Sequence, residues 1–257
     1  MTWKDGSRCA VALSFDFDAE TLWMGAFNLH HPTILARGVF GANVGIWRIL
    51  KVLEKYGVKA TFFVPGWVAD KYPEQLAAIH NGGHELGHHG YLHENPSKFA
   101  LPEEREILEK GIESLKKVSG EAPRGYRTPT GVHSPNTLPL LVDYGFIYES
   151  SMMASDGPYM LPVEGRDKKL VELPIIWELD DVPHFFFNIR PYYVGMSSPY
   201  KVLEIWKDEF DVCYEEGGYL GVIMHPQVTG LRHRVRIEKN RQLHQAVSVG
   251  HEQPLAR

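Results

Sequence analysis

The chain has 257 residues, of which 44% are hydrophobic and 23% charged, a composition typical of one folded globular domain rather than a disordered or fibrous protein. Its formal net charge of −5, without any run of lysines and arginines, argues against nucleic acid or an anionic membrane as a partner. Two cysteines are too few for a disulfide framework, and neither a leader pattern nor an apolar run of transmembrane length is present, so we expect a cytoplasmic protein.

The first half of the chain alternates short apolar strands with amphipathic helical patterns. The first strand, from Val11, ends in Asp16-Phe17-Asp18, and the segment 20–43, rich in glycine, histidine and aromatic residues, is expected to be a long loop. The elements expected after it are a helix from Ile46 to Gly57, a strand over 60–64, a helix over 73–81, a strand over 84–88, a helix that ends at Gly120 and a short strand over 125–127.

In the second half, Ser134-Pro135 predicts the start of a helix that ends at Gly145, since serine caps helices well and proline suits the first turn. Strands are expected over 146–148 and 171–173, and Ser198-Pro199 predicts another helix start. The buried strand 219–224 leads directly into His225. Beyond it, Arg232 to Arg257 is polar and contains no strong closing strand, so we expect one catalytic domain over 1–257, with its core at 9–228 and an atypical polar tail at 229–257.

Strands that alternate with helices in this way predict a parallel sheet with crossover helices. Candidate functional side chains gather at or just after the carboxyl ends of the expected strands, where barrels and open α/β sheets build their active sites. They are Asp16, Asp18, His89, Arg127, Asp180, Asp181 and His225.

A rival motif is His84-Glu85-Leu86-Gly87-His88, which matches the His-Glu-x-x-His pattern of zinc peptidases. That pattern requires a helix to bring both histidines to one face. Here it follows Gly82-Gly83 and contains Gly87, which disfavour a helix, so we interpret the match as accidental.

A second spacing, His89-x-x-x-His93, fits the turn after a strand, where both imidazoles could converge on a metal with Asp18 as an oxygen ligand. Two nitrogens and one carboxylate leave coordination positions free for water and substrate, as catalytic zinc requires. The alternative is that both histidines are ordinary turn residues, but the neighbouring Asp16 and Asp18 favour a metal site.

Five motifs in order resemble those of the polysaccharide deacetylase family, which is also called the NodB-homology group or carbohydrate esterase family four. The motifs are Ser14 to Asp18, His89 to His93, Arg127-Thr128-Pro129, Trp177 to Asp181 and Ile223 to Pro226. The resemblance runs from about Cys9 to about Val228 and implies a deformed (β/α) barrel with seven strands. It also implies hydrolysis of a non-peptide amide bond by a water molecule that a divalent metal activates.

The resemblance assigns roles residue by residue. Asp16 would be the general base, held by Arg127, and His225 the general acid, oriented by Asp181 or its neighbour Asp180. Asp18, His89 and His93 would bind the metal, which we expect to be zinc, with cobalt, manganese or nickel as alternatives. By the same analogy the backbone near Thr130 would stabilise the oxyanion. We expect Trp23 and Trp177 to contact substrate as well, although both could equally be core residues.

The first motif departs from the family pattern, because Phe17 separates two aspartates that are usually adjacent. Together with the long segment after it, this spacing resembles a subgroup of peptidoglycan-deacetylase-like proteins, allantoinases and cyclic imide hydrolases. The substrate could therefore be an N-acetyl sugar or a small cyclic amide or imide, the latter with or without metal. A third hypothesis is an inactive barrel that binds a ligand. We also expect a homo-oligomer.

Overall fold

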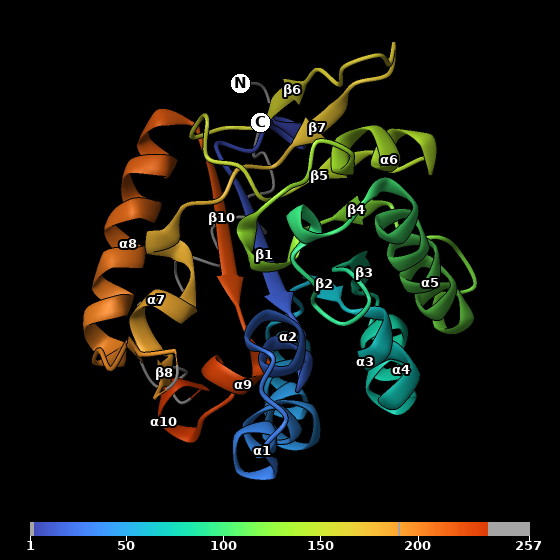
Figure 1. The fold of residues 1–257 in the computed structure, drawn as a ribbon. Coiled ribbons are helices and arrows are strands. Elements are labelled where there is room, and N and C mark those ends of the chain that lie inside the picture. The colour runs from blue at the N-terminus through green and yellow to red at the C-terminus, as the bar shows by residue number, and fades with distance from the viewer. Residues whose placement is uncertain (1–2, 190, 236–257) are drawn as a thin grey trace.

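The computed structural model describes residues 3–189 and 191–235, and its centre is a curled, mostly parallel sheet (Figure 1). Within these residues the sheet has eight strands in the order β10-β1-β2-β3-β4-β5-β7-β6, and only β6 is antiparallel to its neighbour. The order has two free edges, so the sheet forms a half-barrel, consistent with the expected deformed (β/α) barrel. Its strands are β1 (Ala10–Asp16), β2 (Thr61–Val64), β3 (Glu85–His88), β4 (Gly125–Tyr126), β5 (Tyr148–Glu149), β6 (Tyr159–Leu161), β7 (Leu170–Glu172) and β10 (Tyr219–Met224).

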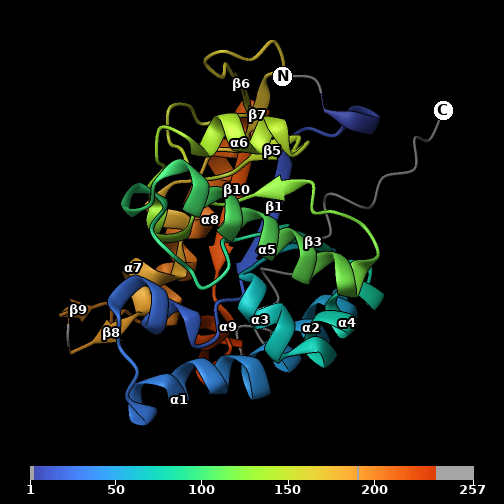
Figure 2. The ribbon, with the colours of Figure 1, turned by 45° about the vertical axis from the view of Figure 1, so that its right-hand side comes forward.

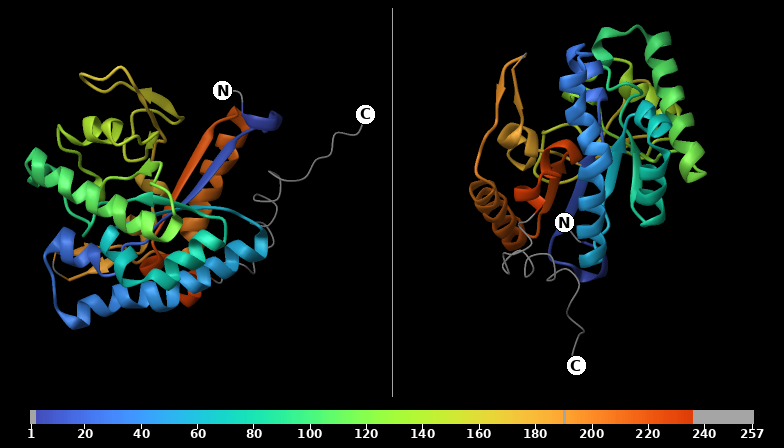
Figure 3. Two further views of the ribbon diagram at one scale, coloured as in Figure 1. Left: turned by 90° about the vertical axis from the view of Figure 1, so that its right-hand side faces the viewer. Right: turned by 90° about the horizontal axis from the view of Figure 1, so that it is seen from below.

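Helices cover the outer side of this sheet, and a small hairpin of β8 (Phe187–Asn188) and β9 (Tyr193–Val194) lies apart from it. Figure 2 shows α3, α4 and α5 grouped together, and the left view of Figure 3 shows β1 and β10 side by side. The helices are α1 (Pro32–Phe40), α2 (Ile46–Tyr56), α3 (Gly66–Lys71), α4 (Pro73–Asn81), α5 (Leu101–Ser119), α6 (Thr137–Asp143), α7 (Asp181–Phe185), α8 (Pro199–Glu216), α9 (Pro226–Thr229) and α10 (Arg232–Val235).

The two faces of the sheet differ in polarity, because successive strand residues point to opposite sides. Phe15 on β1 and Phe62 on β2 stack with ring centroids 4.9 Å apart in the largest apolar cluster, which includes Ile46 and Leu76 from the covering helices. The other face carries polar residues, such as Ser14 and Asp16, that form hydrogen bonds inside the half-barrel, beside apolar ones such as Phe63. The outer face therefore supplies the core, and the inner face is free to carry chemistry.

Most expected elements are confirmed, with ends that shift by one or two residues. α2 ends at Gly57, which adopts the left-handed conformation with φ 63°, and α4 spans Pro73–Asn81 as expected. Ser198 caps α8 by accepting a hydrogen bond from the Tyr200 N–H. α6 begins at Thr137 instead of Pro135, since the Ser134 hydroxyl donates to the buried Glu104 carboxylate.

The segment 20–43 is not the long loop that its composition suggested. It contains a π-helical turn (Leu22–Ala26), α1 and the start of a second π-helical turn (Gly41–Gly45). Glycines in this segment and just after it permit close backbone contacts that a side chain would block: a Cβ on Gly38 would lie 2.4 Å from the Ala19 carbonyl carbon, and one on Gly45 would lie 2.2 Å from the Pro226 carbonyl oxygen. Helix formation here depends on tertiary packing, which local propensity does not report.

Two further observations concern the whole chain. In the expected polar tail, Arg232–Val235 forms the short helix α10, and 236–257 lies outside the described residues. No helix within the described ranges is both long and apolar enough to span a membrane.

Candidate active site

The two aspartates of the first motif point to the same side because they are separated by one residue in an extended segment. The Phe17 N–H donates to the Phe63 carbonyl oxygen at 2.8 Å and extends the pairing of β1 with β2 past Asp16. The Phe17 ring is fully buried in the outer core, 6.5 Å from the Tyr72 ring. Asp16 and Asp18 consequently face the inner side, where both carboxylates are buried.

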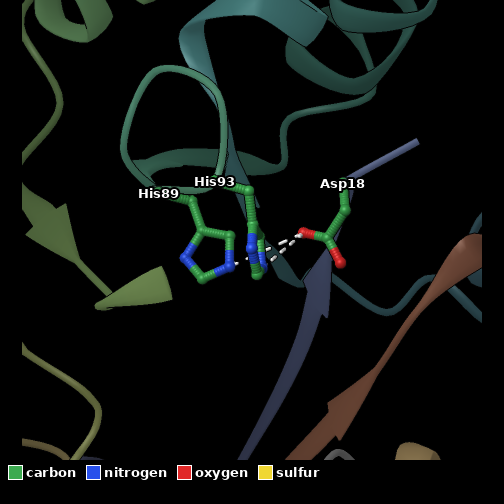
Figure 4. A group of neighbouring side chains, drawn as sticks. All are labelled: Asp18, His89 and His93. Atoms are coloured by element: carbon green, nitrogen blue, oxygen red, sulfur yellow. Dashed lines mark ion pairs between the residues drawn. The ribbon is translucent and has the colours of Figure 1, made fainter. Parts of the chain in front are cut away.

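Asp18, His89 and His93 come together beyond the ends of β1 and β3 (Figure 4). Oδ1 of Asp18 lies 3.5 Å from Nε2 of His89 and 3.8 Å from Nε2 of His93, and one ligand atom from each residue lies within 4.8 Å of the others. His93 reaches the site from a backbone with φ 61°, in the left-handed region. The expected trio is thus a preformed group of one oxygen and two nitrogen donors.

These donors fit a divalent cation. Asp18 is fully buried, and its Oδ1 has no hydrogen-bond partner among the described residues. Burial and the nearby Asp16 carboxylate raise the pKa of Asp18 to about 8, although His225 opposes the shift. Without a cation, the negative charge of Asp18 is therefore poorly balanced by its neighbours. The Nδ1–H of His89 donates a hydrogen bond to the Arg127 carbonyl oxygen at 2.8 Å. The Nε2 lone pair of the neutral ring is therefore free to bind a metal.

Arg127 pairs with Asp16, as the sequence suggested. Its Nη1 lies 2.7 Å from Oδ1 of Asp16 and also donates to the Ser14 hydroxyl at 2.9 Å. Burial alone would raise the pKa of Asp16, but the Arg127 guanidinium, together with His89 and His225, outweighs burial and lowers the pKa below its ordinary value. Asp16 is therefore an ionised carboxylate that a buried arginine holds in place.

His225 follows β10 and is oriented by Asp181. His225 Nδ1 lies 2.7 Å from Oδ1 of Asp181, whose Oδ2 accepts the His225 backbone N–H and the Thr229 hydroxyl. Burial opposes a charge on His225, yet Asp181 and the other nearby carboxylates raise its pKa well above the ordinary value. Asp180 caps α7 through the Val182 N–H and lies farther away, with Oδ1 at 3.9 Å, so Asp181 makes the direct contact with His225.

The candidate base Asp16 and the candidate acid His225 lie next to each other, beside the Asp18, His89 and His93 group. Nε2 of His225 lies 3.9 Å from Oδ2 of Asp16 and 3.8 Å from Oδ2 of Asp18. On the other side, Nε2 of His89 lies 3.8 Å from Oδ2 of Asp16. An ionised carboxylate and a protonated imidazole thus lie beside a site suited to a Lewis acid, an arrangement that can perform acid–base hydrolysis.

The His-Glu-x-x-His match is accidental, since its last four residues form β3. His84 Nδ1 accepts the Ala60 N–H, and His88 Nε2 contacts the Leu108 carbonyl oxygen at 3.1 Å. Burial lowers the pKa of His88 to about 3, so this histidine is neutral. Both are core histidines with backbone partners.

The three expected substrate contacts have different surroundings. Trp23 is fully buried and packs against Phe186, with ring centroids 5.8 Å apart, so its ring belongs to the core and presents no surface to a ligand. Thr130 is exposed and has φ 62°, and the exposed Trp177 ring lies over the adjacent Gly131. Contact of Thr130 and Trp177 with substrate stays a prediction.

Several contributing residues were missed. Gln227 Nε2 donates to Oδ2 of Asp18 at 3.1 Å, and the Ser150 carbonyl oxygen and hydroxyl both accept hydrogen bonds from Arg127. Ser14 could have been found, because it precedes Asp16 by two residues and so shares its strand face. Nothing in the local sequence distinguishes Gln227 or Ser150 from ordinary polar residues.

Comparisons with known proteins agree with the geometry. The family model for polysaccharide deacetylase matches residues 38–148. The peptidoglycan deacetylase of Helicobacter pylori is 36% identical over 245 residues, which cover 85% of this chain and 84% of that protein. A crystal structure from Mycobacterium smegmatis classed with the polysaccharide deacetylases is 34% identical, with a TM-score of 0.88 over 100% of this chain and 96% of its own. Puue allantoinase, 24% identical, has a TM-score of 0.83 over 98% of this chain and 87% of its own, which shows a shared fold.

Proposed function

Because the chain belongs to the polysaccharide deacetylase family, whose members hydrolyse amide carbon–nitrogen bonds, we propose that it is a metal-dependent deacetylase of N-acetylated sugars. The observation that carries the proposal is the position of Asp16 and His225 next to the Asp18, His89 and His93 group. When bound to that group, a divalent ion supplies polarisation of the amide carbonyl and makes a water molecule more acidic. Zinc fits the donor set best, and cobalt, manganese or nickel could replace it.

In the proposed reaction Asp16 takes the proton from the attacking water. The ion pair with Arg127 lowers the pKa of Asp16, which keeps the carboxylate ionised and fixes the direction of Oδ2. Oδ2 is the oxygen that faces the metal group and His225, since Oδ1 is occupied by the guanidinium. Asp16 therefore presents one free oxygen to the water.

His225 donates a proton to the leaving nitrogen. Asp181 holds Nδ1, so Nε2 is the atom that faces Asp16 and the substrate position. A raised pKa keeps the ring protonated before the carbon–nitrogen bond breaks. General acid–base steps of this kind typically contribute about 100- to 10,000-fold to a rate.

The test assays protein reconstituted with zinc for acetate release from N-acetylglucosamine oligomers and for ring opening of allantoin and simple cyclic imides. We expect acetate from the oligomers, and a loss of about 100-fold or more in Asp16→Asn and His225→Ala. Asp143→Asn, at the surface ion pair with Arg166, is the control that keeps full activity. Full activity in both active-site variants would refute the mechanism.

A second candidate is a hydrolase of small cyclic amides or imides, with or without metal. Two observations favour it: Phe17 separates the two aspartates, and the fold of Puue allantoinase matches nearly the whole chain. Hydrolysis of allantoin or an imide without acetate release from the oligomers would identify this activity. A properly metallated protein that turns over none of these amides would favour the third hypothesis, a barrel that only binds.

We further propose that the protein is a cytoplasmic homo-oligomer. The free thiols of Cys9 and Cys213 support a reducing compartment. Large exposed apolar side chains on and beside the β8–β9 hairpin support an interface between copies, because monomers rarely expose such patches. They are Phe187, Ile189, Tyr192, Tyr193, Val194 and Met196. Light scattering during gel filtration measures the mass, and a monomer at micromolar concentration would refute the oligomer.

A further inference from the structure

Two glutamates that the proposed mechanism does not use lie side by side inside the half-barrel. Glu149 on β5 and Glu172 on β7 are register partners, and both side chains have no exposed surface. Two buried carboxylates so close together cannot both carry a charge cheaply. Oε2 of Glu172 is buried and receives no hydrogen bond within the described part of the chain. A proton carried by Oε2 of Glu172 would form a hydrogen bond to the Glu149 carboxylate.

The pair is connected to Arg127 through the two serines after β5. The Ser151 N–H donates to Oε2 of Glu149 at 3.1 Å and to Oε1 of Glu172 at 3.0 Å, and the Ser151 hydroxyl donates to Oε1 of Glu149. The preceding Ser150 accepts two hydrogen bonds from Arg127, from Nε to its carbonyl at 2.8 Å and from Nη2 to its hydroxyl at 2.9 Å.

The same pair also holds both ends of the loop that carries Thr130. At one end, the Thr128 N–H donates to the Ser151 hydroxyl at 2.9 Å. At the other end, His133 Nε2 lies 3.2 Å from Oε1 of Glu149. Hydrogen bonds that lead to the Glu149 and Glu172 carboxyls thus hold both Arg127 and the Thr130 loop in place.

We propose that Glu149 and Glu172 form a carboxyl pair that shares one proton and positions Arg127, and through it the Asp16 carboxylate. These are positioning residues, because neither reaches Asp16 directly. The inference rests on the proposed function for its kinetic consequences. The pair itself is a structural claim that can be tested without any substrate.

The surroundings of the pair agree with a single negative charge. Burial raises the pKa of Glu172 to about 9 and also raises that of Glu149, although Arg127 and the hydrogen bonds from Ser151 oppose the shift at Glu149. Burial lowers the pKa of His133, so its ring is a neutral donor to Glu149. The other titratable groups that face the pair are Arg127, Tyr126, Tyr159 and Tyr219.

The kinetic test compares two isosteric variants. Glu172→Gln keeps a neutral donor where the protonated carboxyl stands, so we expect wild-type kcat and KM. Glu149→Gln removes the charged acceptor of Ser151 and His133, so we expect kcat to fall by about 10- to 100-fold with KM unchanged, the usual effect of losing an orienting group. When Arg127→Lys is already present, Glu149→Gln should lower kcat little further, since both substitutions act by disturbing the position of the Asp16 carboxylate.

The matched control is Glu104→Gln, another buried carboxylate, whose hydrogen bonds within the described residues come from Ser134 and Thr137 and not from Arg127. It is expected to lower stability and leave kcat unchanged. The proposal is overturned if Glu149→Gln keeps wild-type kcat, if Glu172→Gln loses as much as Glu149→Gln, or if the losses of Glu149→Gln and Arg127→Lys simply multiply.

A measurement without substrate separates this inference from the proposed function. The difference between infrared spectra of zinc-loaded wild type and zinc-loaded Glu172→Gln at neutral pH should contain the carbonyl band of a buried protonated carboxylic acid. Because the raised pKa favours the neutral form, stability should fall as pH rises from about 4.5 towards 9, and the fall should be smaller in Glu172→Gln. A difference spectrum without that band overturns the pair. An inactive wild type that has the band refutes the deacetylase and leaves the pair standing.

Discussion

At the scale of single residues, the site is a set of buried charges in which each has a specific partner. Asp16 has Arg127, and His225 has Asp181, at 2.7 Å in both cases. Asp18 is different, because among the described residues its Oδ1 lies near the His89 and His93 imidazoles and has no hydrogen-bond partner. Since burying a charge without a partner is costly, the pattern of satisfied and unsatisfied carboxylates distinguishes the proposed base, Asp16, from the proposed metal ligand, Asp18.

Gln227 should tune the affinity of the metal site. Its Nε2 donates to Oδ2 of Asp18 and so fixes which oxygen remains free. Gln227→Ala is expected to weaken zinc binding by about 10- to 100-fold, as is usual when a group that orients a ligand is lost. Competition with a fluorescent chelator measures the dissociation constant. Gln75→Ala, a buried glutamine that donates to the Ala42 carbonyl oxygen, should bind zinc like the wild type; equal affinity in both variants would contradict the role of Gln227.

Asp181 should set the alkaline limit of activity. A raised pKa keeps His225 protonated above the ordinary histidine range, so kcat/KM should fall only when alkaline pH removes that proton. Asp181→Asn removes the carboxylate that favours the imidazolium, and the alkaline limb should move to lower pH. By linkage, the stability that the pair contributes is complete below the ordinary pKa of histidine and is lost as pH rises through the raised value.

The pH dependence of kcat/KM in wild type and Asp181→Asn measures this shift. Asp143→Asn, whose surface carboxylate pairs with Arg166, serves as the control with an unchanged profile. An alkaline limb at the same pH in Asp181→Asn would show that another group provides the acid.

At the scale of elements, strand alternation and close backbone contacts both position the site. Alternation turns Asp16 and Asp18 inwards and Phe17 outwards, so the extra residue in the motif is absorbed by the core. Glycines then let the segment 20–45 approach the rest of the site. A Cβ on Gly25 would lie 1.8 Å from the Leu92 carbonyl oxygen, and one on Gly41 would lie 2.9 Å from Gln227. The helical segment therefore packs directly on the loop that carries His93 and on α9, which carries Gln227.

Gly45→Ala should destabilise the fold although alanine is the better helix former. The new methyl group would lie 2.2 Å from the Pro226 carbonyl oxygen, which must move, and overpacking of this kind costs about 1–3 kcal/mol. Denaturant unfolding measures the loss. Asn43→Ala, an exposed position in the same turn, introduces the same residue without the contact and should be neutral or stabilising. A neutral Gly45→Ala would mean that α9 can shift freely.

At the scale of the whole molecule, the half-barrel brings together residues that are far apart in the chain. β10 pairs with β1 in parallel, which places His225 beside Asp16 and Asp18. On the other side of β1, β2 and β3 follow in order, and β3 leads into His89. Three separated motifs therefore meet at one end of adjacent strands.

Metal removal should lower the stability of the whole domain. A cation that binds only the folded trio adds RT ln(1 + [L]/Kd) to the free energy of unfolding, about 2.7 kcal/mol when its free concentration is 100 times Kd. Dialysis against a chelator should therefore lower Tm, and zinc should restore it. His93→Ala provides the control, because its Tm should respond to neither treatment. A wild-type Tm that is insensitive to chelator and zinc would contradict a tight metal site.

Features that depend on local pattern could be predicted from the residues alone. Alternation and helical periodicity predicted most strands and helices, and the order of the motifs predicted the family and its deformed (β/α) barrel. The pairing of Asp16 with Arg127 and the grouping of Asp18 with His89 and His93 followed from the same resemblance, and the structure contains both. Their catalytic roles stay predictions.

Features that depend on contacts between distant segments could not be predicted in this way. Asp181 rather than Asp180 bonds His225, because the Asp180 side chain caps α7 and Asp181 is the first residue of that helix. Trp23 lies in the core, and the supposed loop is helical, because glycine-mediated packing overrides its weak local propensity. Glu149 and Glu172 are 23 residues apart in the sequence and form a pair because β5 and β7 are neighbours in the sheet. Burial and long-range hydrogen bonds are set by the fold, and no local pattern encodes them.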